Sequence, residues 1–321
     1  MIKSGRTVLI TGVNGYIGST LAGQLKKKYS VIGIDRQENA NAELAGITYH
    51  KADITDRSSI PTAVEKASIL IHCAALVHNR SKDLSRENYF RVNVTGTENI
   101  LSCVKRSLRR IIFLSTISVY GTQNGALDEG APLIPEEPYA ESKIAAENAI
   151  LTFSKKHAVP ATIFRLAPVY GADFLLNLSK RIYLPGKRAF YRIGSGEQRV
   201  SLCSVHNAVD IIIRGIEDRK FNGRTFNCAD ASAYSINDII RAFQKRYHTR
   251  RMPILTIPPA LPLALLHIFG IVVPAKAKFY RRQLMKIADD ALYDTGALAK
   301  TRAVRQWDIT RTLANTPGKD G

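Results

Sequence analysis

Apolar runs alternate with charged, helix-like stretches through the first half of the chain. The runs TVLITG (7–12), VIGID (31–35), ILIHCAA (69–75), IIFLSTISVYG (111–121) and ATIFRLAPVYG (161–171) are typical of buried strands. The segments 16–28, 88–107 and 138–157 between them have helical spacing and charged faces. Fully apolar strands separated by helices predict a parallel sheet that is covered on both faces, in an α/β doubly wound fold.

The pattern loosens after residue 171. The stretch 177–205 mixes Gly, Pro and polar residues with short apolar pieces, which suits a smaller domain over the carboxyl edge of the sheet. Two further runs, NAVDIIIRGIEDR (207–219) and GRTFNCA (223–229), are typical of a helix and a strand. We therefore predict a first domain over 1–171 and a smaller C-terminal region over 172–321, with 201–228 returning to the core of the first.

Three glycines follow the first predicted strand and open a helix: Gly12, Gly15 and Gly18. In this context the first permits a tight turn, the second lets the backbone approach a pyrophosphate, and the third allows close helix–strand packing. The helix N-terminus favours the phosphate charge. These features predict a dinucleotide site, and the alternative is a strand–turn–helix that binds nothing.

The second predicted strand ends in Asp35, 17 residues beyond Gly18. A carboxylate there can accept hydrogen bonds from both ribose hydroxyls of NAD, and it would repel the 2′-phosphate of NADP. The neighbouring Arg36 could partly offset that repulsion. NAD is therefore the predicted cofactor, with NADP as the alternative, and Asp53 and Ile54 of KADITD are candidate adenine contacts.

Tyr139 and Lys143 stand four residues apart, a spacing that places them on one helix face. Pro138 suits the first turn of that helix. A Lys ammonium beside a phenol lowers the phenol pKa toward neutrality, which makes the phenol a usable acid or base. Thr116, at the end of a central strand, could hydrogen-bond the same substrate oxygen. This set predicts hydride transfer between a nicotinamide and a carbinol carbon.

The spacing proves little without the chemistry. Among 13 tyrosines, one other, Tyr183, has a Lys four residues on, at Lys187. That second pair encloses Pro185 and Gly186, which argue against a continuous helix. It therefore serves as a control within the chain.

The amino-acid composition predicts that the protein binds an anionic partner. The chain of 321 residues has 46 Lys and Arg against 27 Asp and Glu, a formal net charge of +19. This excess attracts phosphorylated metabolites, nucleic acids or acidic membranes. The basic stretch 105–110 has no aromatic residue and 241–250 has only Phe243 and Tyr247, which disfavours nucleic acid.

Three further features of the sequence bear on where in the cell the protein is expected. The longest apolar run, LPLALLHIFGIVV (261–273), is too short to span a bilayer and is either a buried helix or a weak membrane-surface contact. The N-terminus enters a strand without room for a signal segment. The four cysteines form no C-x-x-C pair, so we predict no metal, no disulfide framework and a reduced, cytoplasmic setting; they are Cys73, Cys103, Cys203 and Cys228.

Six motifs in order resemble the extended short-chain dehydrogenase/reductases, namely the NAD-dependent epimerase/dehydratase group that acts on nucleotide sugars. They are TGVNGYIG, HCAALVH, NVTGT, LSTISVYG, YAESK and FRLAPVYG, and the resemblance covers most of residues 7–230. It implies a Rossmann NAD-binding domain over 1–171, a mainly substrate-binding region over 172–321 and a nucleotide-diphosphate sugar as substrate. It also implies a homodimer through the helices carrying Tyr139 and residues 88–107.

The resemblance also implies the role of each matching residue. Tyr139 would be the catalytic acid/base, Lys143 would tune it and hold the nicotinamide ribose, and Thr116 would orient the substrate oxygen. The implied cofactor contacts are Gly12, Gly15, Tyr16, Ile17, Gly18, Asp35, Arg36, Asp53, Ile54, Ala74, Ala75, Asn93, Ser115, Tyr139, Lys143 and Pro168. The implied substrate contacts are Thr116, Ser118, Asn177 and Arg199. In many relatives a phosphate-binding arginine stands where this chain has Val200, one residue from Arg199.

One departure separates this chain from the sugar 4,6-dehydratases of the group. Their strand end continues Ser-Thr-Asp-Glu, whereas Ile117 and Ser118 stand here in place of the two acids. Neither side chain can act as a general acid or base at neutral pH. We therefore predict no dehydratase, but an epimerase or a 4-ketosugar reductase like those of polysaccharide and O-antigen sugar synthesis.

Two other functions stay open. One is a hydroxysteroid-type dehydrogenase of the same superfamily, in which the run 261–273 lines a lipid site. The other is a non-catalytic NAD-binding module. Packing roles are expected for His72, His78, Tyr120 and Tyr170.

Overall fold

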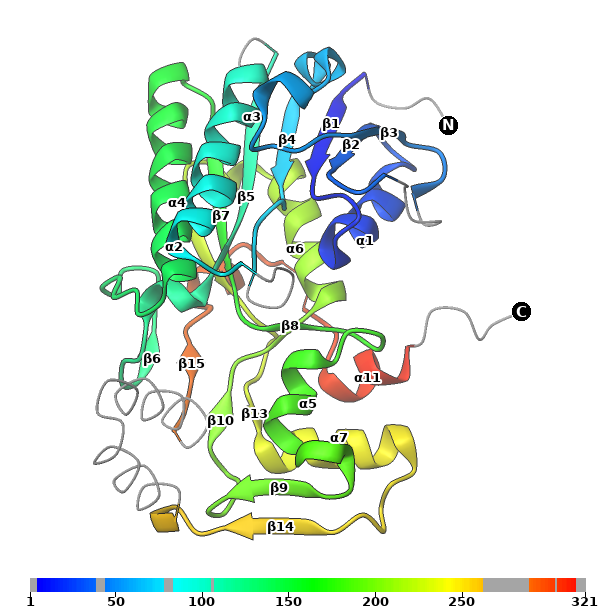
Figure 1. The fold of residues 1–321 in the computed structure, drawn as a ribbon, viewed down its shortest axis with the longest axis vertical. Helices are drawn as coiled ribbons and strands as arrows, with labels where there is room; N and C mark the ends of the chain where they lie inside the picture. The colour runs from blue at the N-terminus through cyan, green and yellow to red at the C-terminus, as the bar shows by residue number, and fades with distance from the viewer. Residues whose placement is uncertain are drawn as a thin grey trace.

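A seven-stranded parallel sheet forms the centre of the molecule (Figure 1). The computed structural model describes residues 5–38, 44–77, 83–104, 107–261, 289–303 and 305–315, apart from the side chains of residues 176 and 177. The strand order is β12-β7-β5-β4-β1-β2-β3. The strands are β1 (Thr7–Thr11), β2 (Ser30–Asp35), β3 (Thr48–Lys51), β4 (Ile69–His72), β5 (Arg110–Thr116), β7 (Ala161–Leu166) and β12 (Thr225–Cys228).

Helices cover both faces of this sheet (Figure 1). On one face α1 (Tyr16–Leu25) and α6 (Val205–Glu217) bury their apolar residues against the strands. On the other face lie α3 (Gly96–Val104) and α4 (Pro138–His157). The predicted α/β doubly wound fold is confirmed.

Two predicted elements are divided in the structure. The run 111–121 stops being a strand at Thr116, because the Thr116 side chain accepts a hydrogen bond from the Ser118 N–H at 3.2 Å and caps a 3₁₀ turn, η5 (Ile117–Tyr120). The predicted helix 88–107 consists of α2 (Arg86–Phe90), a π-helical segment η4 (Arg91–Thr95) and α3.

The catalytic-helix candidate α4 matches its predicted bounds. Pro138 occupies its first turn, and Ala158 ends it in the left-handed conformation. Three basic residues lie in its last turn, where they complement the negative end of the helix dipole. Local sequence therefore defines both ends of this helix.

A second group of elements lies beyond the carboxyl edge of the sheet, in the lower part of Figure 1. Strand β9 pairs in parallel with β14, and β10 pairs antiparallel with β13. Helices α5, α7 and α11 pack with these strands around a separate apolar core. The elements are α5 (Leu176–Ile182), β9 (Phe190–Ile193), β10 (Arg199–Val200), β13 (Tyr234–Ser235), α7 (Ile236–Tyr247), β14 (Ile254–Ile257) and α11 (Ile309–Ala314).

Short pairings join the two groups. Strand β8 pairs with β11, and β6 pairs with β15. Their bounds are β6 (Ala126–Leu127), β8 (Val169–Tyr170), β11 (Cys203–Ser204) and β15 (Leu292–Tyr293), followed by α10 (Gly296–Ala299). No helix of the described segments is long and apolar enough to cross a membrane. His78 and the run 261–273 after Leu261 lie outside the described residues.

Candidate active site

The glycine turn lies between β1 and α1. Gly12 has a φ of +66°, and a Cβ there would lie 2.8 Å from the backbone N and Cα of Ala74. A Cβ on Gly18 would lie 2.4 Å from the Gly12 carbonyl oxygen. Both positions therefore require glycine, the first for a left-handed turn and the second for close packing of α1. Gly15 is the residue that precedes α1.

Asp35, at the end of β2, faces this turn. Its Oδ2 accepts a hydrogen bond from the Asn14 N–H at 3.1 Å, and its Oδ1 accepts one from the Gln37 N–H at 3.2 Å. The first turn of α1 contains no acidic side chain that would repel a phosphate. These features fit an adenine dinucleotide. The glycine turn leaves a cradle that a Cβ would fill, the N-terminus of α1 favours phosphate, and the Asp35 carboxylate lies beside the turn. Arg36 is exposed.

Tyr16 connects the turn to the segment after β8. Its hydroxyl donates to the Asp173 carboxylate at 2.7 Å, and its ring stacks on Phe174 with 4.8 Å between centroids. A Cβ on Gly171 would overlap the Tyr16 hydroxyl, at 1.6 Å. Asp173 and Gly171 were not predicted as site residues. Ile17 is half-buried and packs against the sheet core.

The predicted adenine contacts follow β3. Ile54 is buried and lies against Gly96, where a Cβ would come within 2.6 Å of the Ile54 Cδ1 atom. The exposed Asp53 carboxylate accepts from the Thr55 N–H at 2.9 Å.

The segment after β4 is fastened on two sides. The Ala74 N–H donates to the Thr11 hydroxyl at 3.1 Å. The buried Asn93 accepts from the Leu76 N–H at 2.7 Å and donates to the Ser142 hydroxyl of α4 at 2.9 Å. Asn93 thus holds the segment containing Ala74 and Ala75 against the helix that carries Tyr139.

Thr116, Tyr139 and Lys143 come together where β5 meets α4. The side chains of Thr116 and Tyr139 are hydrogen-bonded to each other. Lys143 is only 2% exposed; its ammonium donates to the Leu114 carbonyl at 2.7 Å and lies 4.1 Å from the centroid of the Phe113 ring. The three residues predicted to be catalytic therefore lie close together.

One prediction about this site is wrong for this structure. Burial raises the pKa of Tyr139 to about 12, against a smaller lowering by the Thr116 hydrogen bond. Burial also lowers the pKa of Lys143 to about 8, and its ammonium is directed to the Leu114 carbonyl. Desolvation therefore outweighs the expected attraction between phenolate and ammonium, and Tyr139 is a neutral phenol.

A buried ion pair that was not predicted secures α4. Glu147, one turn beyond Lys143, pairs with Arg165 of β7 at 2.8 Å, and both side chains are buried. The Ser115 hydroxyl also donates to the Glu147 carboxylate. Ser115, predicted as a cofactor contact, thus points toward this pair. An acid four residues beyond Lys143 and an Arg within an apolar strand were the available signals in the sequence.

The positions that carry acids in dehydratases are not acidic here. Ile117 is buried, while the half-buried Ser118 accepts a hydrogen bond from the Thr116 hydroxyl at 3.1 Å. Pro168, a predicted cofactor contact, lies between β7 and β8, and its carbonyl accepts from the Cys203 N–H at 3.1 Å.

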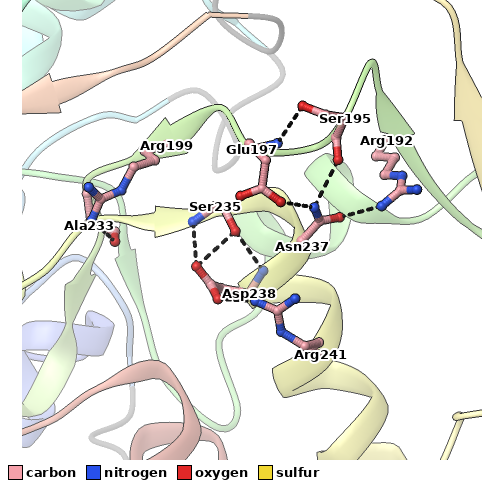
Figure 2. Close-up of polar contacts among 9 residues, drawn as sticks. All are labelled: Arg192, Ser195, Glu197, Arg199, Ala233, Ser235, Asn237, Asp238 and Arg241. Atoms are coloured by element: carbon pink, nitrogen blue, oxygen red, sulfur yellow. Dashed lines mark hydrogen bonds and ion pairs between the residues drawn. The ribbon is translucent and has the colours of Figure 1, made fainter.

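Arg199 and Val200 occupy opposite faces of β10. Val200 is buried, whereas Arg199 is exposed and donates to the Ala233 carbonyl at 3.0 Å. Figure 2 shows the Arg199 side chain reaching Ala233 beside the capping box of Ser235 and Asp238. Since successive strand residues point to opposite faces, Val200 faces the core while Arg199 points outward. The Asn177 side chain is outside the described part of the chain.

The expected packing residues are structural where they are described. His72 is buried between the hydroxyls of Thr11 and Thr97, at 2.6 and 2.9 Å, and burial lowers its pKa to about 3. The Tyr120 hydroxyl donates to Asn227 at 2.7 Å. The Tyr170 hydroxyl donates at 2.7 Å to the buried Asp230, which also accepts from Tyr234, the Ser204 N–H and Asn207.

A protein-family model described as the NAD dependent epimerase/dehydratase family matches residues 8–229. The chain belongs to this family. The predicted resemblance is therefore confirmed, and so is the predicted cofactor, since the family is NAD dependent.

Curated relatives cover most of the chain. A UDP-glucose 4-epimerase of Vibrio cholerae is 28% identical over 74% of this chain and 75% of its own length. An N-acetyl-alpha-D-glucosaminyl-diphospho-ditrans,octacis-undecaprenol 4-epimerase of Escherichia coli O157:H7 is 25% identical over 85% of this chain and 82% of its own. A dTDP-glucose 4,6-dehydratase of Streptomyces niveus is 29% identical over 51% of this chain and 54% of its own.

Solved structures share the whole fold. The UDP-glucuronic acid 4-epimerase of Bacillus cereus in complex with NAD has a TM-score of 0.73 at 22% identity, with 96% of each chain covered. The UDP-glucose 4-epimerase of Thermotoga maritima with UDP-glucose also has a TM-score of 0.73, at 17% identity and 96% coverage of each chain. This chain therefore has the same fold as these two solved epimerases.

Proposed function

We propose that this protein is an NAD-dependent 4-epimerase of a hexose carried on a diphosphate, in the first instance a nucleotide-diphosphate sugar. The main support for the proposal is that Thr116, Tyr139 and Lys143 lie close together at the carboxyl edge of the sheet. The glycine turn and Asp35 lie at the carboxyl ends of other strands of the same sheet. The relatives of Vibrio cholerae and Escherichia coli are both 4-epimerases, which supports C4 of a sugar as the reacting carbon.

Bound NAD would supply hydride exchange with the sugar carbon. For the sugar to be oxidised, Tyr139 on the first turns of α4 must first lose its own proton, because only the phenolate can accept the proton of the sugar hydroxyl; it returns that proton to the keto oxygen when hydride returns to the carbon. The Lys143 ammonium and the positive charge of bound NAD+ would favour that phenolate. Thr116, hydrogen-bonded to Tyr139, orients that oxygen. Lys143, fixed by the Leu114 carbonyl, supplies a positive charge beneath the site.

The same residues can serve a 4-ketosugar reductase, which is the second candidate. Its support is the protonated Tyr139, which is already able to donate a proton to a keto oxygen. We propose no dehydratase activity, because Ile117 and Ser118 offer neither an acid to the leaving hydroxyl nor a base to the C5 proton.

The division of labour is part of the proposal. Residues 1–171 bind NAD, and residues 172–321 mainly bind the substrate. A homodimer through α4 and residues 88–107 is also proposed, with the exposed Leu151 of α4 as an apolar contact. Sedimentation of Leu151→Glu against the unchanged chain tests that interface, since a buried glutamate should dissociate the dimer.

The test of the activity uses purified protein with NAD and a panel of nucleotide-linked hexoses and their 4-keto forms. Conversion of a sugar without net reduction of NAD supports the epimerase. Stoichiometric change of the cofactor supports the reductase. If no sugar reacts while NAD still raises the thermal stability, the non-catalytic alternative replaces the proposal.

A further inference from the structure

Positive charge is concentrated in one segment of the second half of the sequence. Residues 239–288 contain ten Lys or Arg and no Asp or Glu, which is more than half of the formal net charge of +19. Within the described part of this segment, Lys245, Arg250 and Arg251 are exposed. The described part of this charge is separate from the NAD site, because α7 and the residues that follow it lie far from β1 and β2 (Figure 1).

These cations surround a concave surface. A cavity of about 870 Å³ is lined by Arg188, Gln244, Lys245, His248, Thr249, Arg250, Arg251 and Met252. No acidic residue belongs to this lining. The Thr249 hydroxyl is buried and has no hydrogen-bond partner among the described residues. A cavity with several cations, no carboxylate and an unused hydroxyl suits phosphate groups.

Exposed apolar side chains belong to the same stretch of the chain, residues 247–261. Tyr247, Ile254, Leu255 and Leu261 are 40–51% exposed, and they are four of the eight large apolar side chains exposed in the described segments. Ile254 and Leu255 lie on β14, which pairs with β9 and with no other described strand. Figure 1 places β14 at the lower extremity of the molecule. Exposed aliphatic residues on an edge strand mark an interaction surface.

We propose that this surface, the basic pole, docks on an anionic membrane. The basic pole comprises the cavity cations Arg188, Lys245, Arg250 and Arg251 with the apolar residues Tyr247, Ile254, Leu255 and Leu261. The cations bind lipid phosphates, while the apolar side chains enter the boundary between headgroups and acyl chains.

The combination of cations and apolar side chains favours an anionic membrane over free phosphate and over a single-stranded nucleic acid. A free phosphate would use the cations and leave Ile254 and Leu255 without a role. A single-stranded nucleic acid requires stacking surfaces, whereas three of the four apolar residues here are aliphatic. Charge and aliphatic surface together match the two signals that peripheral membrane binding requires.

Sedimentation with lipid vesicles tests the proposal. The full chain should bind vesicles of phosphatidylcholine with phosphatidylglycerol and not vesicles of phosphatidylcholine alone. The triple variant Lys245→Gln, Arg250→Gln and Arg251→Gln should bind the anionic vesicles about a hundredfold more weakly. A matched control, Lys27→Gln with Lys155→Gln and Lys156→Gln, removes the same charge from exposed positions of the sheet domain and should bind normally.

A second variant, Ile254→Ser with Leu255→Ser, separates insertion from charge. Its binding should be more salt-sensitive than that of the unchanged chain, because only the electrostatic part remains. Equal binding to both kinds of vesicle, equal loss in the control variant, or complete displacement by inorganic phosphate at constant ionic strength would overturn the proposal. Tighter binding to a single-stranded RNA than to anionic vesicles would also overturn it.

Discussion

Two regions of this molecule contain a tyrosine four residues before a lysine, and they use the pair differently. In α4, Tyr139 and Lys143 share one helix, and Lys143 is buried and fixed by the Leu114 carbonyl. Tyr183 instead ends α5, and Gly186, with a φ of +81°, separates it from an exposed Lys187. A tyrosine four residues before a lysine can therefore serve as a reactive pair only when a continuous helix and buried partners fix both side chains.

The largest difference between the two regions should appear in turnover. Tyr139→Phe removes the proton-carrying hydroxyl and should lower kcat by about a thousandfold, while the ring still packs near Tyr89, 5.9 Å away. Tyr183→Phe retains the stacking on Phe190 and should leave kcat unchanged. Steady-state kinetics on the converted sugar measures both, and an equal loss in the two variants would break the comparison.

Glycine substitutions in the two regions should affect the binding of NAD differently. Gly18→Ala places a Cβ 2.4 Å from the Gly12 carbonyl oxygen, a backbone atom, so it should destabilise the fold by about 3 kcal/mol and abolish stabilisation by NAD. Gly186→Ala meets no atom within 4 Å and only a strained φ, which costs about 1 kcal/mol. Thermal unfolding with and without NAD distinguishes them; a normal NAD response in Gly18→Ala would contradict the account of the turn.

The anchoring of α4 is tested by two of its own glutamates. Glu147→Gln leaves Arg165 as a buried charge without its partner and should cost about 3–5 kcal/mol of unfolding free energy. Glu141, paired with Arg86 at the surface, should cost less than about 1 kcal/mol when changed to Gln. Urea unfolding measures both variants, and similar losses would mean that the buried pair does not anchor the helix.

The pH dependence of stability should reveal the burial of His72. Burial lowers the pKa of His72 to about 3, so the unfolded chain takes up a proton first and stability falls from pH 6.5 toward pH 3. His72→Gln should reduce that slope by at most about 1.4 kcal/mol per pH unit. Urea titrations at stepped pH measure the slope in the variant and in the unchanged chain, and an equal slope in both would contradict the burial of a neutral His72.

The fold and the meeting of the catalytic residues were predictable because local signals are strong there. Apolar strands, the glycine turn and the Pro138 helix start each indicate their element without knowledge of the rest of the chain. The strand after residue 110 was predicted too long, because the Thr116 cap that ends it depends on a side-chain hydrogen bond.

Other parts of the site depend on contacts between distant residues. The pairs Glu147–Arg165 and Tyr16–Asp173 join positions 18 and 157 residues apart, so periodicity does not reveal them. The Tyr139 pKa was predicted in the wrong direction because desolvation depends on packing. The outward position of Arg199 follows from the register of a two-residue strand, and no run of apolar residues in the sequence predicts that register.

The central claim is that hydride leaves and returns to the same sugar carbon. The most direct measurement follows a nucleotide-linked hexose deuterated at C4 through turnover by the NAD-loaded protein, with mass spectrometry of product and cofactor. The account predicts an inverted sugar that retains its deuterium at C4, with no uptake of solvent hydrogen at C5. Solvent hydrogen at C5 together with loss of water from the sugar would contradict it and would assign a dehydratase instead.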